Sequence, residues 1–585
     1  MENIEGSNVE VGRAEAPEVS EASGSESTGA ASWVESRVVN YLVGAAVVGF
    51  VFWWLQFSTA SICCGDFDGY YHVKWSRMLW ESIRAGNFPP LFTQLPLTTL
   101  NARDYVDHHF LFHVLQIPFT WFRDPVLGAK IGTTLFASLA VLSCYWLVVR
   151  YRLRYPLLWL LALLASSAPF LYRMNMAKAM SVSIVLMVAG IYLLFERKYA
   201  WLAPLAFLFA LAYDMFALLC LAAVVWSVVV FWSERRIEWQ PVVWTAVGSL
   251  AGFIINPYFP RNIRLFVEHL LMKMTKDDFP VKVGGEWYPY ESWEFLMNAF
   301  VACVAMVVGY IAFRGDDRKT DARPLFFLIF TTVLLIANAR WKRFSEYWPP
   351  FAVLFAAFSL QPVLSGARRA VASRLPSSVM DELEPFLDRH ERPETVERRE
   401  RARWKELAFV FVVFAYLTAQ LVGNVRHEVL EIANSAPPEH YRAATDWIRS
   451  NVPKGEMIFN TDWDDFPRLF YFAPEYTYVS GLDPTYLHDK NPELSELFQK
   501  ITTGEENNPG PIIRDRFGSR YVFTDNEHES FYNNALDSGW FDEVYADDEA
   551  TVLRIRDAKG APPPIPEEEM NEEEDQNAQE PEPTN

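Results

Sequence analysis

The chain has 585 residues, of which 51% are hydrophobic and 15% aromatic, and its net charge is −20. Most of this negative charge lies in the two terminal segments. Residues 1–37 contain eight Glu and two Arg, and residues 557–585 contain ten acids and one Lys. Both acidic tails are poor in aromatic residues, which predicts disorder. The remainder is nearly balanced, so we expect no nucleic-acid partner. The five cysteines form no spacing typical of a disulfide framework or a zinc site.

Apolar runs of roughly 20 residues, about the thickness of a bilayer, fill the region between the tails. The polar tail precedes the first run, so we expect an uncleaved anchor at Val38–Ser58 and no cleaved signal peptide. The runs predict a polytopic α-helical membrane domain over residues 38–424 with about eleven spans. These are 38–58, 126–148, 156–172, 178–195, 199–213, 214–232, 241–257, 294–313, 324–339, 348–364 and 406–424.

The stretch 199–232 has a single charged residue, Asp214. As one helix it would be about 51 Å long, which exceeds the roughly 30 Å hydrocarbon core. We therefore expect two helices that turn near Tyr213–Asp214. Asp214 would border a site at this turn, or would simply mark the tip of the turn.

Lys and Arg are concentrated in alternate short loops, and this pattern places the N-terminus in the cytoplasm. With eleven spans, the first loop, 59–125, and residues 425–585 share the outer, periplasmic or extracellular, face. We expect a multi-pass protein of the plasma (inner) membrane. The outer segment 340–347 is the exception, because it contains three basic residues.

Residues 425–556 predict a soluble α/β domain of ordinary domain size. A helix is expected within Pro438–Asn451, and short β-type runs are expected at Met457–Asn460, Tyr476–Ser480, Tyr521–Thr524 and Val552–Ile555.

The first outer loop is the most informative segment for chemistry. It contains the string GDFDGYYH, with Asp66 and Asp68, and later the string DHHFLFH, with Asp107 and His109. Carboxylates are hard ligands for Mg²⁺ or Mn²⁺, and such a cation would neutralise phosphate groups. A solvated interface with an amphipathic helix would also account for both strings.

The string DGYYHVKWSRML, soon after a first transmembrane helix, resembles the first-loop motif of oligosaccharyltransferase catalytic subunits. These enzymes are GT-C glycosyltransferases that use polyprenyl- or dolichyl-linked donors. The resemblance implies a GT-C-like fold and places Asp68 at the family's metal-binding, catalytic Asp, with Asp66 beside it. It also implies a divalent metal, Mg²⁺ or Mn²⁺.

Three later segments are similar to family motifs and follow the same order. The string GGEWYP puts Glu286 at the family's Glu, near the metal and the acceptor. The string KRFSEYWP puts Arg343 at an Arg that contacts the lipid phosphate. The string TDWDDF is loosely similar to the acceptor-recognition motif, which implies acceptor binding by Trp463 and Asp464.

The chain also departs from the family. The loop 172–178, which should carry a second acidic motif, has no acid but contains Arg173, a second candidate for binding the donor phosphate. Either the metal has fewer ligands, or Asp66, Asp107 or His109 substitutes, or no metal is needed. The string GLDPTY, Gly481–Tyr486, has no assigned role and is expected to be a loop that turns at Asp-Pro.

We hypothesise sugar transfer from a polyprenyl-(pyro)phosphate donor to an acceptor outside the membrane, with glycan, lipid and protein as acceptor candidates. Asp68 would bind metal or act as general base, Glu286 would orient the acceptor or complete the metal shell, and Arg343 and Arg173 would stabilise the leaving phosphate. The first alternative is a GT-C monosaccharide transferase acting on lipid, polysaccharide or cell-wall glycan. The second is a non-enzymatic transporter or scaffold. Nothing in the sequence indicates an oligomeric state.

Overall fold

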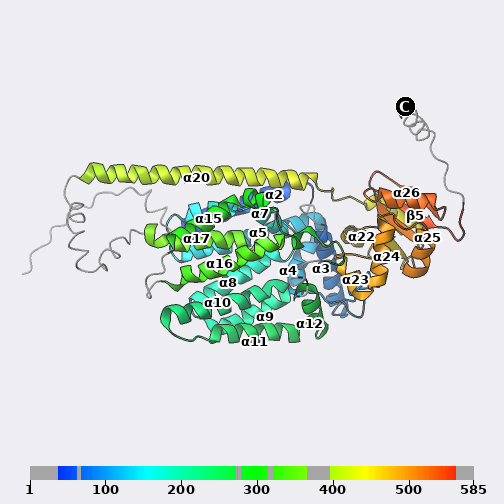
Figure 1. Cartoon of the computed structure of the whole chain (residues 1–585), viewed down its shortest axis with the longest axis horizontal. Helices are drawn as coiled ribbons and strands as arrows, with labels where there is room; N and C mark the ends of the chain where they lie inside the picture. The colour runs from blue at the N-terminus through cyan, green and yellow to red at the C-terminus, as the bar shows by residue number, and fades with distance from the viewer. Residues whose placement is uncertain are drawn as a thin grey trace, which may run out of the picture.

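The computed structural model describes residues 37–61, 67–271, 273, 279–313, 321–364 and 395–560. Figure 1 shows a bundle of helices on the left and a smaller domain, coloured orange to red, on the right. Helices α3 (Asp68–Ala85) and α4 (Phe110–Gln116) of the first loop lie between the two parts. The predicted disordered tails lie almost entirely outside the described residues.

Five helices among the described residues are long and apolar enough to cross a membrane. They are α2 (Arg37–Phe57), α5 (Pro125–Arg150), α10 (Ala217–Glu234) together with the preceding turn η3 (Asp214–Phe216), α16 (Ala322–Arg340) and the later part of α20 (Thr395–Asn434).

Two bent pairs raise the number of candidate spans to seven: α6 (Pro156–Ala165) with α7 (Ala168–Met174), and α14 (Ser292–Asn298) with α15 (Phe300–Ala312). The other apolar helices are shorter: α4 together with η1 (Ile117–Trp121), α8 (Met180–Phe195), α9 (Leu202–Ala212), α11 (Gln240–Ile255) and α17 (Trp348–Leu364). Every predicted span falls on one of these helices or pairs, so the chain is a multi-pass membrane protein. The predicted count of eleven spans is not confirmed.

The structure differs from the predicted spans at two bends. The range 156–172 turns by 84° at Ser166–Ser167, and the range 294–313 turns by 85° near Ala299. The first bend has a local cause, because Ser167 accepts a hydrogen bond from the amide of Phe170 and caps the new helix α7, whose first turn contains a proline. The bend changes the direction of the chain at α7, whose residues are mostly buried and which carries Arg173 near its end. The predicted break near Tyr213–Asp214 is confirmed, because α9 ends at Ala212.

Helices α9 and α11 are in close contact because glycines on α11 lack side chains. A Cβ atom on Gly248 would lie 2.1 Å from the carbonyl oxygen of Ala203, and one on Gly252 would lie 2.7 Å from the Cβ of Ala210. Helix α9 leads directly to Tyr213, so this contact fixes one wall of the site described below.

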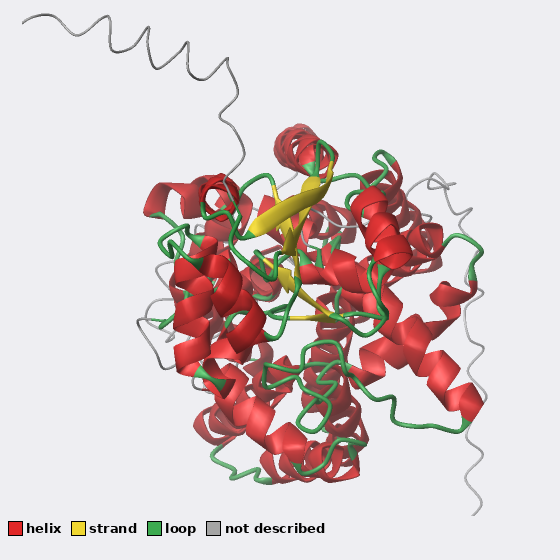
Figure 2. Cartoon of the chain, turned by 90° about the vertical axis from the view of Figure 1, so that its right-hand side faces the viewer, coloured by secondary structure: helices red, strands yellow, loops and turns green. Residues whose placement is uncertain are grey.

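The C-terminal domain contains a five-stranded sheet in the order β2-β1-β3-β5-β4. Strand β1 pairs in parallel with β2 and β3, whereas β5 pairs antiparallel with β3 and β4. The strands are β1 (Met457–Asn460), β2 (Thr477–Tyr478), β3 (Tyr521–Asp525), β4 (Phe541–Ala546) and β5 (Ala550–Ile555). The helices around the sheet are α21 (Arg442–Asn451), α22 (Phe466–Phe472), α23 (Thr485–Lys490), α24 (Pro492–Thr502), α25 (Pro509–Ile512), η7 (Ile513–Phe517) and α26 (Glu529–Asp537). Figure 2 shows the strands among these helices.

The first loop and the C-terminal domain share one hydrophobic core. Trp75 and Phe92 from the loop are buried together with Phe466 and Phe470 of α22. Backbone bonds reinforce this contact, because the amide of Tyr478 donates to the carbonyl of Gln94 at 2.7 Å, and the amide of Thr99 donates to the carbonyl of Tyr486 at 3.0 Å. The two segments therefore lie at the same end of the membrane domain.

We expect Gly248→Ala to lower the unfolding temperature of the purified protein by several degrees. The added methyl group meets a backbone oxygen that cannot move cheaply, and overpacking typically costs about 1–3 kcal/mol. Gly49→Ala in α2 is the matched control, because no heavy atom lies within 4 Å of its added Cβ and both substitutions gain the same helix propensity. Equal unfolding temperatures for the two variants would contradict the packing described here.

Candidate active site

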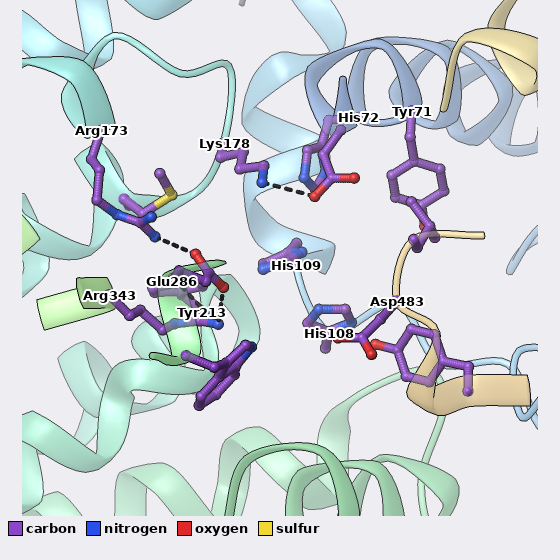
Figure 3. Close-up of a pocket in the computed structure, with 15 residues that line it drawn as sticks. Tyr71, His72, His108, His109, Arg173, Lys178, Tyr213, Glu286, Arg343 and Asp483 are labelled. Atoms are coloured by element: carbon purple, nitrogen blue, oxygen red, sulfur yellow. Dashed lines mark hydrogen bonds and ion pairs between the residues drawn. The ribbon is translucent and has the colours of Figure 1, made fainter. Parts of the chain in front are cut away.

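A cavity of about 100 Å³ lies where the membrane helices, the first loop and the C-terminal domain meet (Figure 3). It is much larger than the roughly 10–15 Å³ that one water molecule needs. Most of its side chains are charged or can form hydrogen bonds. The lining residues are Asp68, Tyr71, His72, His108, His109, Arg173, Lys178, Met180, Tyr213, Glu286, Trp287, Arg343, Leu482, Asp483 and Tyr486.

Glu286 lies between two arginines at one side of this cavity (Figure 3). It belongs to the short helix η5 (Gly285–Trp287), and its carboxylate accepts from Nη2 of Arg173 and from Nη1 of Arg343, both at 2.9 Å. Burial opposes ionisation of Glu286, but the guanidinium groups of Arg343 and Arg173 outweigh it and hold the pKa of Glu286 well below its usual range. Glu286 is therefore a fixed anion.

Further contacts hold the two arginines in place. Arg173 donates through Nε to the fully buried carboxylate of Glu346 at 3.1 Å, on the turn η6 (Lys342–Glu346). Arg343, on the same turn, donates to the hydroxyl of Tyr213 at 2.9 Å and lies over the Trp287 ring at 5.0 Å. Guanidinium groups fixed in this way are suited to binding an anion.

Asp68 is the first residue of α3, and its carboxylate lies 2.7 Å from the ammonium group of Lys178. Lys178 lies in the short loop between α7 and α8, where the resemblance leads one to expect an acid. The two side chains are only 26% and 17% exposed, respectively, so the ion pair is largely shielded from solvent. The positive charge of Lys178 therefore lies beside the carboxylate that was predicted to bind a metal.

Asp107 is almost fully buried and does not line the cavity. Its carboxylate lies 2.8 Å from Nδ1 of His113 and accepts from the indole of Trp75 and the amide of His109, both at 3.0 Å. His113 in turn lies 2.7 Å from His72, which does line the cavity.

Five of the predicted site residues line one cavity, namely Asp68, His109, Arg173, Glu286 and Arg343. Asp66 lies outside the described residues. Trp463 and Asp464 lie in the turn after β1 and are not among the residues that line the cavity. Asp214 lines a smaller adjacent pocket that shares His108 with the cavity.

The segment Gly481–Tyr486, which leads into the first residues of α23, supplies lining residues to which sequence reasoning gave no role. Leu482, Asp483 and Tyr486 reach the cavity from the C-terminal domain, and Asp483 forms an ion pair with Lys273. Gly481 packs against Phe466, where a Cβ would lie 2.3 Å from the ring, and Leu482 has a positive φ of 65°. The unusual GLDPTY string was the available signal. His72 ends the GDFDGYYH string and Lys178 ends the loop 172–178, but sequence reasoning gave neither residue a role.

The described members of the predicted metal set do not bring three ligand atoms close together. Among the described residues, only Asp462, Asp525 and His528 place three such atoms within 4.8 Å of one another. They lie near the carboxyl ends of the parallel strands β1 and β3, and they do not line the cavity.

The sequence matches no protein-family model and no curated protein. The fold is similar to that of the apo oligosaccharyltransferase of Archaeoglobus fulgidus, with a TM-score of 0.56 at 12% identity over 85% of this chain and 71% of that one. A structure of the same enzyme with zinc and sulfate gives a TM-score of 0.52 at 13% identity, over 84% and 69% of the two chains.

The arabinofuranosyltransferase AftD from Mycobacteria gives a TM-score of 0.50 at 14% identity over 90% of this chain. The match covers 40% of AftD, so this chain spans less than half of that protein. These proteins are GT-C glycosyltransferases, and the chain has a divergent GT-C fold like that of the oligosaccharyltransferase.

We expect Glu346→Ala to destabilise the protein by about 1.5–3 kcal/mol, the usual loss for a buried hydrogen bond to a charged group. The substitution leaves the Nε donor of Arg173 buried without its partner. Thermal unfolding measures the effect, with Glu294→Ala as control, because the Glu294 carboxylate is 39% exposed and lies 3.4 Å from Lys342. If the two variants unfold at the same temperature, Glu346 does not support Arg173.

Proposed function

We propose that this chain is a membrane glycosyltransferase that moves a sugar or oligosaccharide from a polyprenyl-phosphate or -pyrophosphate donor to an acceptor on the outer face of the membrane. The GT-C fold supports this proposal only at the level of architecture. The charge pattern of the cavity supports it at the level of chemistry.

One observation carries the proposal. Three cations, Arg173, Lys178 and Arg343, line one small cavity at the junction of the membrane domain and the C-terminal domain. A lipid-linked donor has its phosphate at such a boundary, with its chain in the membrane and its sugar outside. Fixed cations at this position would stabilise the charge that grows on the phosphate as the glycosidic bond breaks.

We assign roles to the residues on this basis. Arg343 and Arg173 bind the donor phosphate, and Glu286 keeps both guanidinium groups oriented. Asp68, which contacts Lys178 and lines the same cavity, faces the bound donor and acceptor. The first loop and the C-terminal domain face outside, so that the acceptor enters from that side.

A divalent cation, Mg²⁺ or Mn²⁺, does not fit the described residues of the predicted set. The carboxylate of Asp68 is paired with Lys178, and both oxygens of Glu286 are paired with arginines. The carboxylate of Asp107 already forms hydrogen bonds with His113, Trp75 and the amide of His109. A divalent ion beside Lys178 would meet a like charge at short range. We therefore propose that the protein's own cations neutralise the phosphate.

A second candidate function is transfer of one sugar to lipid, polysaccharide or cell-wall glycan. It is favoured by the positions of Trp463 and Asp464, the residues expected to recognise a peptide acceptor, which do not line the cavity. Both candidates share the donor chemistry, and the acceptor distinguishes them. Mass spectrometry of glycans, glycolipids and glycoproteins from a strain lacking the gene would identify the missing product.

We expect Asp68→Asn and Glu286→Gln to abolish restoration of that product in the deletion strain. Each change removes a negative charge beside a protein cation while preserving side-chain shape. The measurement is product abundance by mass spectrometry, normalised to the amount of protein in the membrane. Glu294→Gln is the matched control and should restore the product fully. Full restoration by both site variants would refute the assignment.

We expect Arg343→Ala to weaken binding of a polyprenyl phosphate by about 10- to 100-fold, because a charge-assisted hydrogen bond contributes about 1.5–3 kcal/mol. Native mass spectrometry of the purified protein measures the binding, and Lys342→Ala, at the adjacent residue outside the cavity lining, is the control. The wild type should bind equally with and without EDTA. Binding that requires added Mg²⁺ or Mn²⁺ would contradict the assignment of Lys178, Arg173 and Arg343.

A further inference from the structure

We propose that His72 is the group that takes the proton from the acceptor, and that His113 and Asp107 behind it are positioning residues. This inference rests on the proposed function and adds a residue that neither the motifs nor the fold comparison assigns. It follows from a chain of hydrogen bonds that runs from a buried carboxylate to the cavity.

This chain of hydrogen bonds joins three residues from different parts of the first loop. Asp107 precedes α4, His113 lies on α4, and His72 lies on α3. The carboxylate of Asp107 is 2.8 Å from Nδ1 of His113, and Nε2 of His113 is 2.7 Å from Nδ1 of His72. The exposed fractions of the three residues are 1%, 0% and 3%, so water does not compete for these contacts.

The donors around Asp107 indicate the direction of the bond between Asp107 and His113. The indole of Trp75 and the amide of His109 can only donate, and both donate to the Asp107 carboxylate. His113 therefore donates its Nδ1 hydrogen to the same carboxylate, and in the proposed arrangement the Nε2 atom of His113 is the acceptor. His72 donates its own Nδ1 hydrogen to that atom. The remaining nitrogen of His72, Nε2, then carries an unshared pair, and the His72 ring lines the cavity.

The neighbours of His72 favour its neutral form, which a proton acceptor requires. Burial lowers the pKa of His72 well below its usual range, and the neighbouring His113 and Lys178 lower it further. The lowered pKa favours the uncharged ring of His72, whose free nitrogen can receive a proton during the reaction. Asp68, the alternative base, is already paired with the Lys178 ammonium group.

In the proposed step, one bond forms and one bond breaks at the anomeric carbon of the donor sugar. An acceptor oxygen or nitrogen forms a bond to the anomeric carbon, and the bond from that carbon to the phosphate oxygen breaks. The bonding electrons leave with the phosphate, which Arg173 and Arg343 bind. The acceptor proton moves to Nε2 of His72. The resulting imidazolium donates to His113, and the charge is stabilised through His113 by Asp107, as in other carboxylate–histidine arrangements.

The first test uses membranes from the deletion strain, which contain the native donor and acceptor, together with purified protein. We expect His72→Ala to reduce product formation by about 100-fold or more, the usual contribution of general-base catalysis. Added imidazole should restore part of the activity, because it can occupy the vacated space and take the proton. His427→Ala, at a side chain that is 58% exposed, is the control and should keep full activity. Activity of His72→Ala near the wild-type level would overturn the proposal, as would a loss that imidazole does not restore while polyprenyl phosphate still binds.

The second test does not depend on transfer activity. Diethyl pyrocarbonate reacts with an unprotonated ring nitrogen, so His72 should be modified faster than His113, as measured by peptide mass spectrometry. A bound polyprenyl phosphate should protect His72. Asp107→Leu should slow the modification, because His113 no longer holds the His72 tautomer. An unreactive His72 in the wild type would overturn this inference alone. Absence of both product and polyprenyl phosphate binding in the wild type would instead refute the proposed function.

Discussion

The carboxylate of Glu286 is the contact on which the geometry of the cavity depends. It separates two guanidinium groups that would otherwise repel each other at close range. Arg173 comes from a bent helix, Arg343 from a turn before α17, and Glu286 from a loop between them in sequence. One anion therefore fixes three segments, and the hydrogen-bond donors of the arginines are oriented before any ligand arrives.

This arrangement divides the cavity into two chemically different sides. Figure 3 shows Arg173, Arg343 and Glu286 grouped together, with His72 and Asp483 away from them across the space. The arginine side is suited to a leaving phosphate, and the His72 side is suited to an acceptor that must lose a proton. Lys178, which forms an ion pair with Asp68, also lines the cavity and is its third cation after Arg173 and Arg343. In the proposed function, positive charge on the protein takes the place of the metal ion that the sequence motifs implied.

Local patterns in the sequence predicted much of the fold. The charge at Asp214 indicated the break between two helices, and the run at Met457–Asn460 coincides with β1. Strand β4 was missed because it lies at the sheet edge, where the acids Asp542 and Glu543 are tolerated and weaken the apolar pattern. The 84° bend was also missed, although a serine cap followed closely by a proline was a visible signal.

The site was predictable only in part, for a physical reason. Motif order indicated Asp68, Glu286 and Arg343, and all three line the cavity. The partners of these residues depend on long-range packing, which no local pattern encodes. The pair of Asp68 with Lys178 spans more than a hundred residues, and the contact of His72 with His113 spans 41.

The shared core of the first loop and the C-terminal domain affects how the protein is made. Trp75 and Phe92 emerge from the ribosome more than 300 residues before their partners on α22. Synthesis proceeds at roughly 5–20 residues per second, so the partners of these apolar side chains are made some tens of seconds later. Until α22 is made, the first loop lacks the part of its core that the C-terminal domain supplies. A chain that ends before α22 would leave this surface uncovered, so the burial of the first loop depends on the completed C-terminal domain.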